Sequence, residues 1–315
     1  MSQNVICPLC HSVGDSGRID RFDVDDLVAG YREIFHIETG QLFRNDQLEY
    51  YRCKKCDLKY FSPLATGDEA FYQSLQKSDW YYEDEKHEYD YVRQFIKSSD
   101  KVLEVGCGKG AFSRFIECRH YTGLEFSQSA RDIAKAGGVE ILNESIEDHA
   151  EKHKDYDVVV SFQVLEHVAH TRIFLQAMLG ALKPDGFLIV AVPSEDSWLS
   201  LAPNGLLNMP PHHVTRWSDR VFDFVAREFG LITVEIYHET IQGNHYVPAL
   251  SAMISSRILS AVGVRRSLLE TSVARRMLFK VCDWTAKLLS LTISPSISIN
   301  GHTVVAVFRK EVEKA

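Results

Sequence analysis

Two pairs of cysteines near the start of the chain have a spacing that suits metal binding: Cys7 and Cys10 in CPLC, and Cys53 and Cys56 in CKKC. Two residues between thiolates let both sulfurs bind one face of a tetrahedral ion, so two pairs complete a four-cysteine site. Because four sulfurs leave no open position, we expect a structural zinc ion in a zinc-ribbon-like module over residues 1–62. Free thiols or redox-active pairs are the alternative.

Two adjacent histidines, His212 and His213, follow two prolines in the stretch PPHHVTRWS. Prolines fix φ, so the pair is expected on a stiff loop, where a histidine can accept a proton near neutral pH. We favour His213 over His212 as the catalytic base. The structural alternative is that one imidazole hydrogen-bonds the loop backbone while Trp217 anchors the loop. Arg216 could pair with a ligand phosphate or carboxylate, or be an exposed surface residue.

A glycine-rich turn follows an apolar stretch in KVLEVGCGKGAF, with Gly106, Gly108 and Gly110 at alternate positions. Glycine permits positive φ and lets a ligand approach the backbone closely. Glu125 ends the next predicted strand, where a carboxylate can accept hydrogen bonds from both hydroxyls of a ribose. The G-x-G-x-G spacing differs from the G-x-G-x-x-G of dinucleotide sites. These residues predict a positively charged nucleoside ligand instead of a pyrophosphate.

The residues from 99 to 243 alternate apolar strands with amphipathic helices, including one expected over 111–118. This alternation predicts an α/β fold with a parallel, doubly wound, Rossmann-like sheet, completed by a last strand within 296–311. Ligands bind such sheets beyond the carboxyl ends of the strands, so the glycine turn and the histidine loop are expected on the same rim. We assign 63–98 to a helical linker and 244–295 to a helical insertion before the last strand.

The ordered motifs VLEVGCGKG, GLEFS, DYDVVVSFQVLEHV and LKPDGFLIVAVPS resemble those of class I S-adenosylmethionine-dependent methyltransferases. The resemblance covers residues 80–243 and the last strand. The cysteine pairs, the stretch YYEDEKHEYDYV and the stretch LNMPPHHVTRWS are also similar to one subgroup of bacterial methyltransferases, which is often associated with sugar and surface-glycan biosynthesis. The fold and the cofactor are therefore expected to be those of this family.

The resemblance also implies which residues bind S-adenosylmethionine. Its methionine end would lie against Glu104, Gly106, Gly108 and Gly110, its ribose against Glu125, its adenine against Ser145 and Ile146, and its methyl group near Phe162 and Gln163. Ser145 stands near a position where such enzymes often carry an aspartate. Glu166 and His167, in LEHV, keep two readings: they line the methyl-transfer space, or they form a local pair that packs the start of the next helix.

The chain has 315 residues, a formal net charge of −8 and seven cysteines, an odd number. An acidic balance argues against nucleic acid as a partner. No apolar run approaches the roughly 18 residues that cross a bilayer, and the first residues, MSQNVICPLC, lack the basic and apolar regions of an export signal. We therefore expect a cytoplasmic protein without a disulfide framework, and we leave its oligomeric state open.

The segment 245–291 combines apolar and basic residues, with seven lysines and arginines against two acidic residues. Spacings of three and four predict an amphipathic helix whose apolar stripe is formed by Leu269, Val273, Met277, Val281, Trp284 and Leu288. Its basic residues Arg276, Lys280 and Lys287 recur on another face. The helix is expected to cap the sheet, or to attract an anionic acceptor, or to rest peripherally on the inner face of an anionic membrane.

Two classes of function follow from these patterns. The first is methyl transfer from S-adenosylmethionine to a small or glycan-type acceptor, such as a nucleotide-linked or lipid-linked sugar of surface-polysaccharide biosynthesis. The second is a non-catalytic scaffold or adaptor that keeps the methyltransferase fold and the zinc module. A dehydrogenase is disfavoured by the spacing of the glycines. The atom that would be methylated, oxygen, nitrogen or carbon, stays open.

Overall fold

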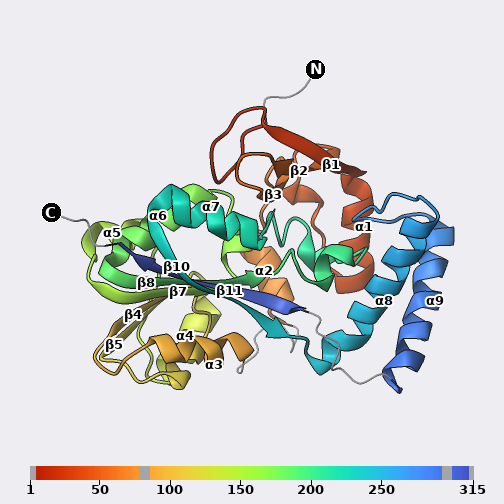
Figure 1. Cartoon of the computed structure of the whole chain (residues 1–315). Helices are drawn as coiled ribbons and strands as arrows, with labels where there is room; N and C mark the ends of the chain where they lie inside the picture. Colours follow the sequence, from red (N-terminus) through yellow and green to blue (C-terminus); the bar gives the residue numbers. More distant parts are fainter. Residues whose placement is uncertain (1–4, 78–85, 293–299, 312–315) are drawn as a thin grey trace.

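The chain is organised around two β-sheets of different size (Figure 1). The computed structural model describes residues 5–77, 86–292 and 300–311. Helices cover both faces of the larger sheet, as an α/β Rossmann-like fold requires, and the smaller sheet belongs to the N-terminal part of the chain. Residues 78–85, which include part of the predicted motif YYEDEKHEYDYV, lie outside the described residues.

The larger sheet contains seven strands: β4 (Lys101–Val105), β5 (His120–Leu124), β6 (Ile141–Leu142), β7 (Tyr156–Phe162), β8 (Leu182–Pro193), β10 (Leu231–Thr240) and β11 (Asn300–Lys310). Their order across the sheet is β10-β11-β8-β7-β4-β5-β6. The strands from β4 to β8 pair in parallel, but β11 is antiparallel to both β8 and β10. The predicted Rossmann-like sheet is thus confirmed, and the structure adds that β11 runs antiparallel between β10 and β8.

Both faces of this sheet are covered (Figure 1). One face carries α3 (His87–Val92) and α4 (Gln128–Ala136), and the other carries α5 (Ile146–Lys152), α6 (Thr171–Ala181) and α7 (Asp219–Phe229). Burial on both faces explains the apolar runs of β4 and β7, where Val102, Leu103, Val158 and Val159 are fully buried. The helix predicted over 111–118 is a shorter 3-10 helix, Ala111–Phe115. The linker contains α2 (Glu69–Leu75) in addition to α3.

The N-terminal module consists of β1 (Ser16–Asp23), α1 (Val24–Phe35), β2 (Gln47–Cys53) and β3 (Lys59–Ser62). Its sheet gains a fourth strand, β9 (Thr215–Arg216), from the histidine loop. β9 pairs with β3, so that Lys59 lies opposite Arg216 and Tyr60 lies opposite Thr215. The hydroxyl of Tyr31 on α1 donates to the carbonyl of Leu206, 2.7 Å away. Residues 5–62 are therefore joined to the larger domain through the loop that carries the two histidines.

The insertion before β11 forms a helical hairpin of α8 (Gly243–Ala261) and α9 (Val273–Ser290) (Figure 1). The buried residues of α9 are Cys282 and Ala286. Their side chains are small, which allows α9 to pack closely against α8. The predicted apolar stripe is not the packing face: Val273, Met277, Val281, Trp284 and Leu288 are exposed by 46–67%. Of the readings left open for this helix, the cap over the sheet gains no support from the stripe, since α9 packs against α8 through small side chains. Residues 293–299 lie outside the described residues.

Short 3-10 helices complete the described structure: Gly40–Leu42, Arg93–Phe95, Leu165–His167, Trp198–Leu201 and Leu206–Asn208. None of the helices in the described ranges is long and apolar enough to cross a membrane.

Candidate active site

The glycine turn lies at the carboxyl end of β4, next to the point where the strand order reverses between β4 and β7. Gly106, Gly108 and Gly110 have φ values of 71°, 52° and 71°, in the left-handed region that favours glycine. A Cβ at Gly106 would lie 2.5 Å from Cγ2 of Val164, in the loop that follows β7. The turn thus requires glycine for its backbone conformation and for its contact with that loop.

The carboxylate of Glu125, at the end of β5, holds this turn in place. Its Oε2 accepts a hydrogen bond from the backbone N–H of Gly108 at 2.9 Å, and its Oε1 accepts one from Ser127 at 2.7 Å. Each oxygen keeps further lone-pair capacity for a ligand hydroxyl. The structure therefore brings Glu125 and the glycine turn together as the sequence predicts, and the pair suits the ribose and methionine ends of S-adenosylmethionine.

Glu104 lies beneath the turn instead of on its open side. Its side chain is 1% exposed and accepts a hydrogen bond from the hydroxyl of Tyr121. Burial raises the pKa of Glu104 to about 8, because a carboxylate is poorly solvated there. Glu104 supports the turn from the interior in this structure, and its predicted contact with the cofactor stays a prediction.

The residues predicted to flank the adenine begin α5. The hydroxyl of Ser145 accepts a hydrogen bond from the backbone N–H of Asp148 at 3.1 Å and donates one to its carboxylate at 2.8 Å. An acidic group therefore lies beside Ser145, although residue 145 itself is not acidic. The side chain of Ile146 is only 2% exposed and belongs to the main core. Its predicted contact with the adenine stays a prediction.

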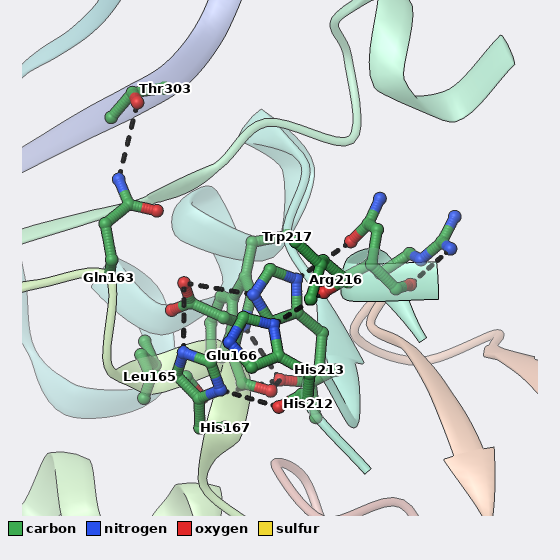
Figure 2. A network of polar contacts seen from close by, with 12 residues as sticks. Gln163, Leu165, Glu166, His167, His212, His213, Arg216, Trp217 and Thr303 are labelled. Atoms are coloured by element: carbon green, nitrogen blue, oxygen red, sulfur yellow. Dashed lines mark hydrogen bonds and ion pairs between the residues drawn. The ribbon is translucent and has the colours of Figure 1, made fainter. Parts of the chain in front are cut away.

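Phe162 ends β7 and Gln163 follows it, on the predicted methyl-transfer side. Phe162 is 4% exposed and packs against the rings of Tyr89 and Phe112, with centroid distances of 4.9 and 4.8 Å. Gln163 adopts a positive φ of 57°. Its amide donates to Thr303 at 3.3 Å (Figure 2) and to Glu88, also at 3.3 Å. The turn of the backbone at Gln163 leads the chain into the loop that carries Glu166 and His167.

Three imidazoles come together beside Glu166: those of His167, His212 and His213 (Figure 2). The ring centroid of His167 lies 4.5 Å from that of His212 and 4.8 Å from that of His213. His212 and His213 are 8% and 7% exposed, and the Nδ1 of His212 lies 2.8 Å from the carbonyl of Leu207. One imidazole therefore hydrogen-bonds the loop backbone, as the structural alternative in the sequence analysis expected. We call the four residues Glu166, His167, His212 and His213 the histidine cluster.

Burial controls the charges in the histidine cluster. It raises the pKa of Glu166 to about 8, and it lowers the pKa of His167 to about 4. The pKa values of His212 and His213 are also well below the ordinary histidine value, first because of burial and then because of neighbouring imidazoles. The imidazoles are therefore neutral near pH 7 and can accept a proton or bind a metal ion.

Glu166 and His167 belong to this cluster, so the reading of LEHV as only a local helix-packing pair is too narrow. The sequence contained the residues but not their proximity, since 45 residues separate His167 from His212. A histidine beside a carboxylate at the end of a predicted parallel strand was the available signal. The contact of His167 with the loop that carries His212 and His213 exists only in the folded chain.

Arg216 and Trp217 fix the end of the histidine loop. Arg216 is 5% exposed, donates to the backbone carbonyl of Asn208 at 2.6 Å and lies over the ring of Tyr50 at 5.2 Å. Trp217 is fully buried and donates to the hydroxyl of Thr215 at 3.0 Å. The alternative of an exposed Arg216 is therefore wrong, and both side chains hold the loop against the N-terminal module.

The four predicted zinc ligands lie together in the N-terminal module. The Sγ atoms of Cys7 and Cys56 are 3.5 Å apart, as are those of Cys10 and Cys53, and all four sulfurs lie within 4.8 Å of one another. Zinc–sulfur bonds of about 2.3 Å in a tetrahedron place sulfurs about 3.8 Å apart, so this arrangement fits the ion. His11 and Asp57, one residue after each pair, both have positive φ and end similar tight turns.

A family model described as a methyltransferase domain matches residues 80–236. This range holds β4, the glycine turn, Glu125, and the loop with Glu166 and His167. After this match we call residues 80–236 the methyltransferase domain. The methyltransferase domain is thus the part of the chain in which the cofactor residues were predicted.

Curated relatives of the methyltransferase domain carry the name ubiquinone biosynthesis O-methyltransferase. The protein from Salmonella paratyphi A is 34% identical over 110 residues, which cover 31% of this chain and 46% of that protein. The protein from Hydrogenovibrio crunogenus is 26% identical over 168 residues, which cover 46% of this chain and 68% of that protein. The first alignment thus spans less than half of the relative's length. None of these names refers to a glycan.

Solved structures support the fold. A SAM-dependent methyltransferase from Archaeoglobus fulgidus superposes with a TM-score of 0.50 at 15% identity, over 76% of this chain and all of that one. A chain from the complex of the Haloferax volcanii Trm112 methyltransferase activator with a putative methyltransferase also has a TM-score of 0.50, at 16% identity. It covers 73% of this chain and 91% of its own length.

Proposed function

We propose that the protein transfers a methyl group from S-adenosylmethionine to an oxygen atom of a small acceptor. The observation that carries the proposal is the meeting of two sites at one rim of the sheet. The glycine turn is held by Glu125, and its Gly106 contacts Val164, two residues before Glu166. A nucleoside site and a cluster of neutral imidazoles therefore adjoin within the methyltransferase domain.

The chain's own residues would mainly align the reactants and handle one proton. Bound S-adenosylmethionine supplies an electrophilic methyl group on a sulfonium. Glu125 would hold the ribose, and Phe162 and Gln163 would limit the space beside the methyl group. The Nδ1 of His213 lies 3.1 Å from the side-chain oxygen of Asn208, so this nitrogen carries the hydrogen. Nε2 of His213 can then accept the proton of an acceptor hydroxyl.

Two acceptor classes should be compared directly. The names of the curated relatives favour an acceptor of ubiquinone biosynthesis, whereas the glycan-type acceptor is supported only by the resemblance of the chain's motifs. We expect purified protein with S-adenosylmethionine to add one methyl mass to a hydroxylated quinone precursor or to a nucleotide-linked sugar, measured by mass spectrometry. Release of S-adenosylhomocysteine should equal the methyl groups added. Cofactor binding without turnover across both classes would favour the scaffold alternative.

We also propose that Cys7, Cys10, Cys53 and Cys56 hold one structural zinc ion. Their sulfurs have the separations that a tetrahedral ion needs, and all four side chains are buried. The ion would tie the two cysteine turns together next to β3, and β3 pairs with β9 of the histidine loop. Its role would therefore be to position that loop.

We further propose that the outer face of α9 rests on an anionic membrane surface. Five exposed apolar residues, Val273, Met277, Val281, Trp284 and Leu288, follow one side of the helix. Its exposed basic residues are Arg276, Lys280 and Lys287. Apolar side chains that can enter the headgroup region, flanked by cations, match the surface of an anionic bilayer in polarity and charge.

Charge reversal of α9 tests this membrane contact. Each basic residue near an anionic surface contributes about 1 kcal/mol, so Arg276→Glu with Lys280→Glu should weaken binding to phosphatidylglycerol vesicles by at least about thirtyfold. Sedimentation with vesicles would measure binding, and the loss should shrink as salt is added. Reversal of Lys152 and Lys154, which are exposed elsewhere, is the matched control.

Unchanged vesicle binding in the α9 variant would reject the membrane contact. If acceptor KM rises instead, the basic residues attract an anionic acceptor. If the oligomeric state changes, the face is a contact between copies of the chain. Cofactor affinity should be the same in the parent, the α9 variant and the control, since α9 lies outside the methyltransferase domain.

A further inference from the structure

The three imidazoles of the histidine cluster are oriented by hydrogen bonds at the same ring nitrogen. Nδ1 of His167 lies 2.6 Å from the carbonyl oxygen of His212, and Nδ1 of His212 lies 2.8 Å from that of Leu207. Nδ1 of His213 lies 3.1 Å from the side-chain oxygen of Asn208. Because these oxygens only accept, each Nδ1 carries the hydrogen and each Nε2 carries a lone pair.

The carboxylate of Glu166 faces these lone pairs. Its Oε1 lies 3.8 Å from Nε2 of His167 and 3.8 Å from Nε2 of His213 (Figure 2). Glu166 is 1% exposed, and within the described residues neither of its oxygens accepts a hydrogen bond. In its ionised form this buried carboxylate would face only lone pairs, which is unfavourable because nothing compensates its lost hydration. A positively charged group between these atoms would stabilise the ionised form.

A shared proton does not satisfy the geometry, since 3.8 Å is too long for a hydrogen bond. A metal ion does satisfy it. Nitrogen and oxygen ligands about 2.1 Å from a tetrahedral ion lie about 3.4 Å apart. The 3.8 Å separations of Glu166 from two of the imidazoles are close to this value, and the three imidazoles offer ring nitrogens within 4.8 Å of one another. Metal-binding histidines also characteristically donate their second ring N–H to a carbonyl or carboxylate, as all three do here to oxygen acceptors.

We propose that His167, His212, His213 and Glu166 bind one divalent transition-metal ion at the acceptor side of the methyltransferase domain. Three imidazoles and one carboxylate suit zinc, cobalt, manganese or iron, and they differ from the all-sulfur set of the N-terminal module. A five- or six-coordinate ion would keep one or two positions for acceptor oxygens. His167 has the most exposed side chain of the four, 18%, so an acceptor would approach from its side.

The role of this ion rests on the proposed methyl transfer, whereas its binding does not. A coordinated acceptor hydroxyl has a lower pKa and gives its proton to solvent. Its oxygen then forms the bond to the methyl carbon, and the carbon–sulfur bond breaks with its electron pair remaining on sulfur. In this case the histidines act through the ion, and no single histidine is the base.

The number and type of metal ions per chain test the proposal. We would strip the full-length protein with a chelator, reload it with cobalt(II), and measure metal content and the absorption spectrum. We expect two ions per chain: one with the intense thiolate charge-transfer absorption of a four-cysteine site, and one with only the weak visible bands of nitrogen and oxygen ligands. Cys53→Ser should remove the first signal. The second should remain detectable but weaker, because this substitution also loosens the loop that carries His212 and His213.

The combined variant Glu166→Gln with His167→Asn should remove the second ion and keep the first. Loss of an outer-shell partner alone weakens metal binding by about 10–100-fold, so loss of two ligands should weaken it by more than about a hundredfold. His153→Gln, which removes an exposed histidine from another part of the domain, should leave both ions in place. Circular dichroism and S-adenosylmethionine affinity should match the parent, which would show that the variant is folded.

Only one ion per chain in the parent, with thiolate absorption, would overturn the proposal. A second ion that persists in the Glu166 and His167 variant would also overturn it. Neither measurement needs an acceptor or turnover, so failure of the metal site and failure of the proposed methyl transfer are distinguishable. If the metal site is present but methyl transfer is unchanged after its removal, the ion binds without the proposed role.

Discussion

Replacing Cys53 by serine should release the ion from the four-cysteine cluster and loosen the histidine loop as well as the N-terminal module. Structural zinc binds with an apparent free energy of about 10–16 kcal/mol, and this energy contributes to folding. All four cysteines belong to the same core cluster as Trp217, which anchors the histidine loop. The pairing of β3 with β9 gives a second connection, so loss of the ion should reach residues 206–216.

Metal analysis and amide hydrogen exchange would measure these two effects. Thiolate-bound zinc should fall from one ion per chain to near zero, and exchange should become faster over 47–62 and 206–216. Central strands β4 and β7 should stay protected because they are buried on both faces. Cys118→Ser, which changes a cysteine outside the cluster, should retain the zinc. Full zinc content in Cys53→Ser would disprove the shared site.

Replacing Glu125 by alanine should weaken S-adenosylmethionine binding by about ten- to a hundredfold or more. The charge-assisted hydrogen bonds that this carboxylate would accept from the two ribose hydroxyls contribute about 1.5–3 kcal/mol in total, which corresponds to that loss. The substitution also removes the acceptors for the N–H groups of Gly108 and Ser127, so the glycine turn loses its anchor. The structure therefore places the expected effect at the upper end of this range.

Isothermal titration calorimetry with S-adenosylmethionine would measure the loss directly. Glu125→Gln keeps the size of the side chain but removes its charge, so its affinity should lie between those of the parent and Glu125→Ala. Glu140→Ala, at an exposed carboxylate before β6, is the control and should bind normally. If Glu125→Ala bound the cofactor as tightly as the parent, Glu125 would have no part in the site.

Short-range features of the fold and of the site were predictable from the sequence. Cysteine spacing identified Cys7, Cys10, Cys53 and Cys56, and the structure brings their sulfurs together. The strand–glycine–helix pattern placed Gly106 to Gly110 at the end of β4, and Glu125 at the end of β5. These features depend on a few neighbouring residues, whose φ preferences and periodicity are local properties.

Burial was less predictable, because periodicity does not say which face of a helix meets the rest of the protein. The spacing of Met277, Val281 and Trp284 correctly predicted a helix, yet these residues are exposed. Close packing of α8 and α9 uses Cys282 and Ala286 instead, since small side chains allow the helices to approach. Likewise, Glu104 lies near the end of β4, directly before the glycine turn, where the sequence predicts a contact with the cofactor. Its side chain is nevertheless buried.

The sequence by itself determined the Rossmann-like alternation, the metal-binding pattern of the cysteines and the glycine turn with its carboxylate. Only the tertiary structure joined β9 to the sheet of the N-terminal module, and only it brought His167 to His212, His213 and Glu166. The physical reason is the sequence distance of the contacts. Local turns follow from the conformational preferences of adjacent residues, whereas the histidine cluster forms only when the sheet and its core bring two distant loops to the same rim.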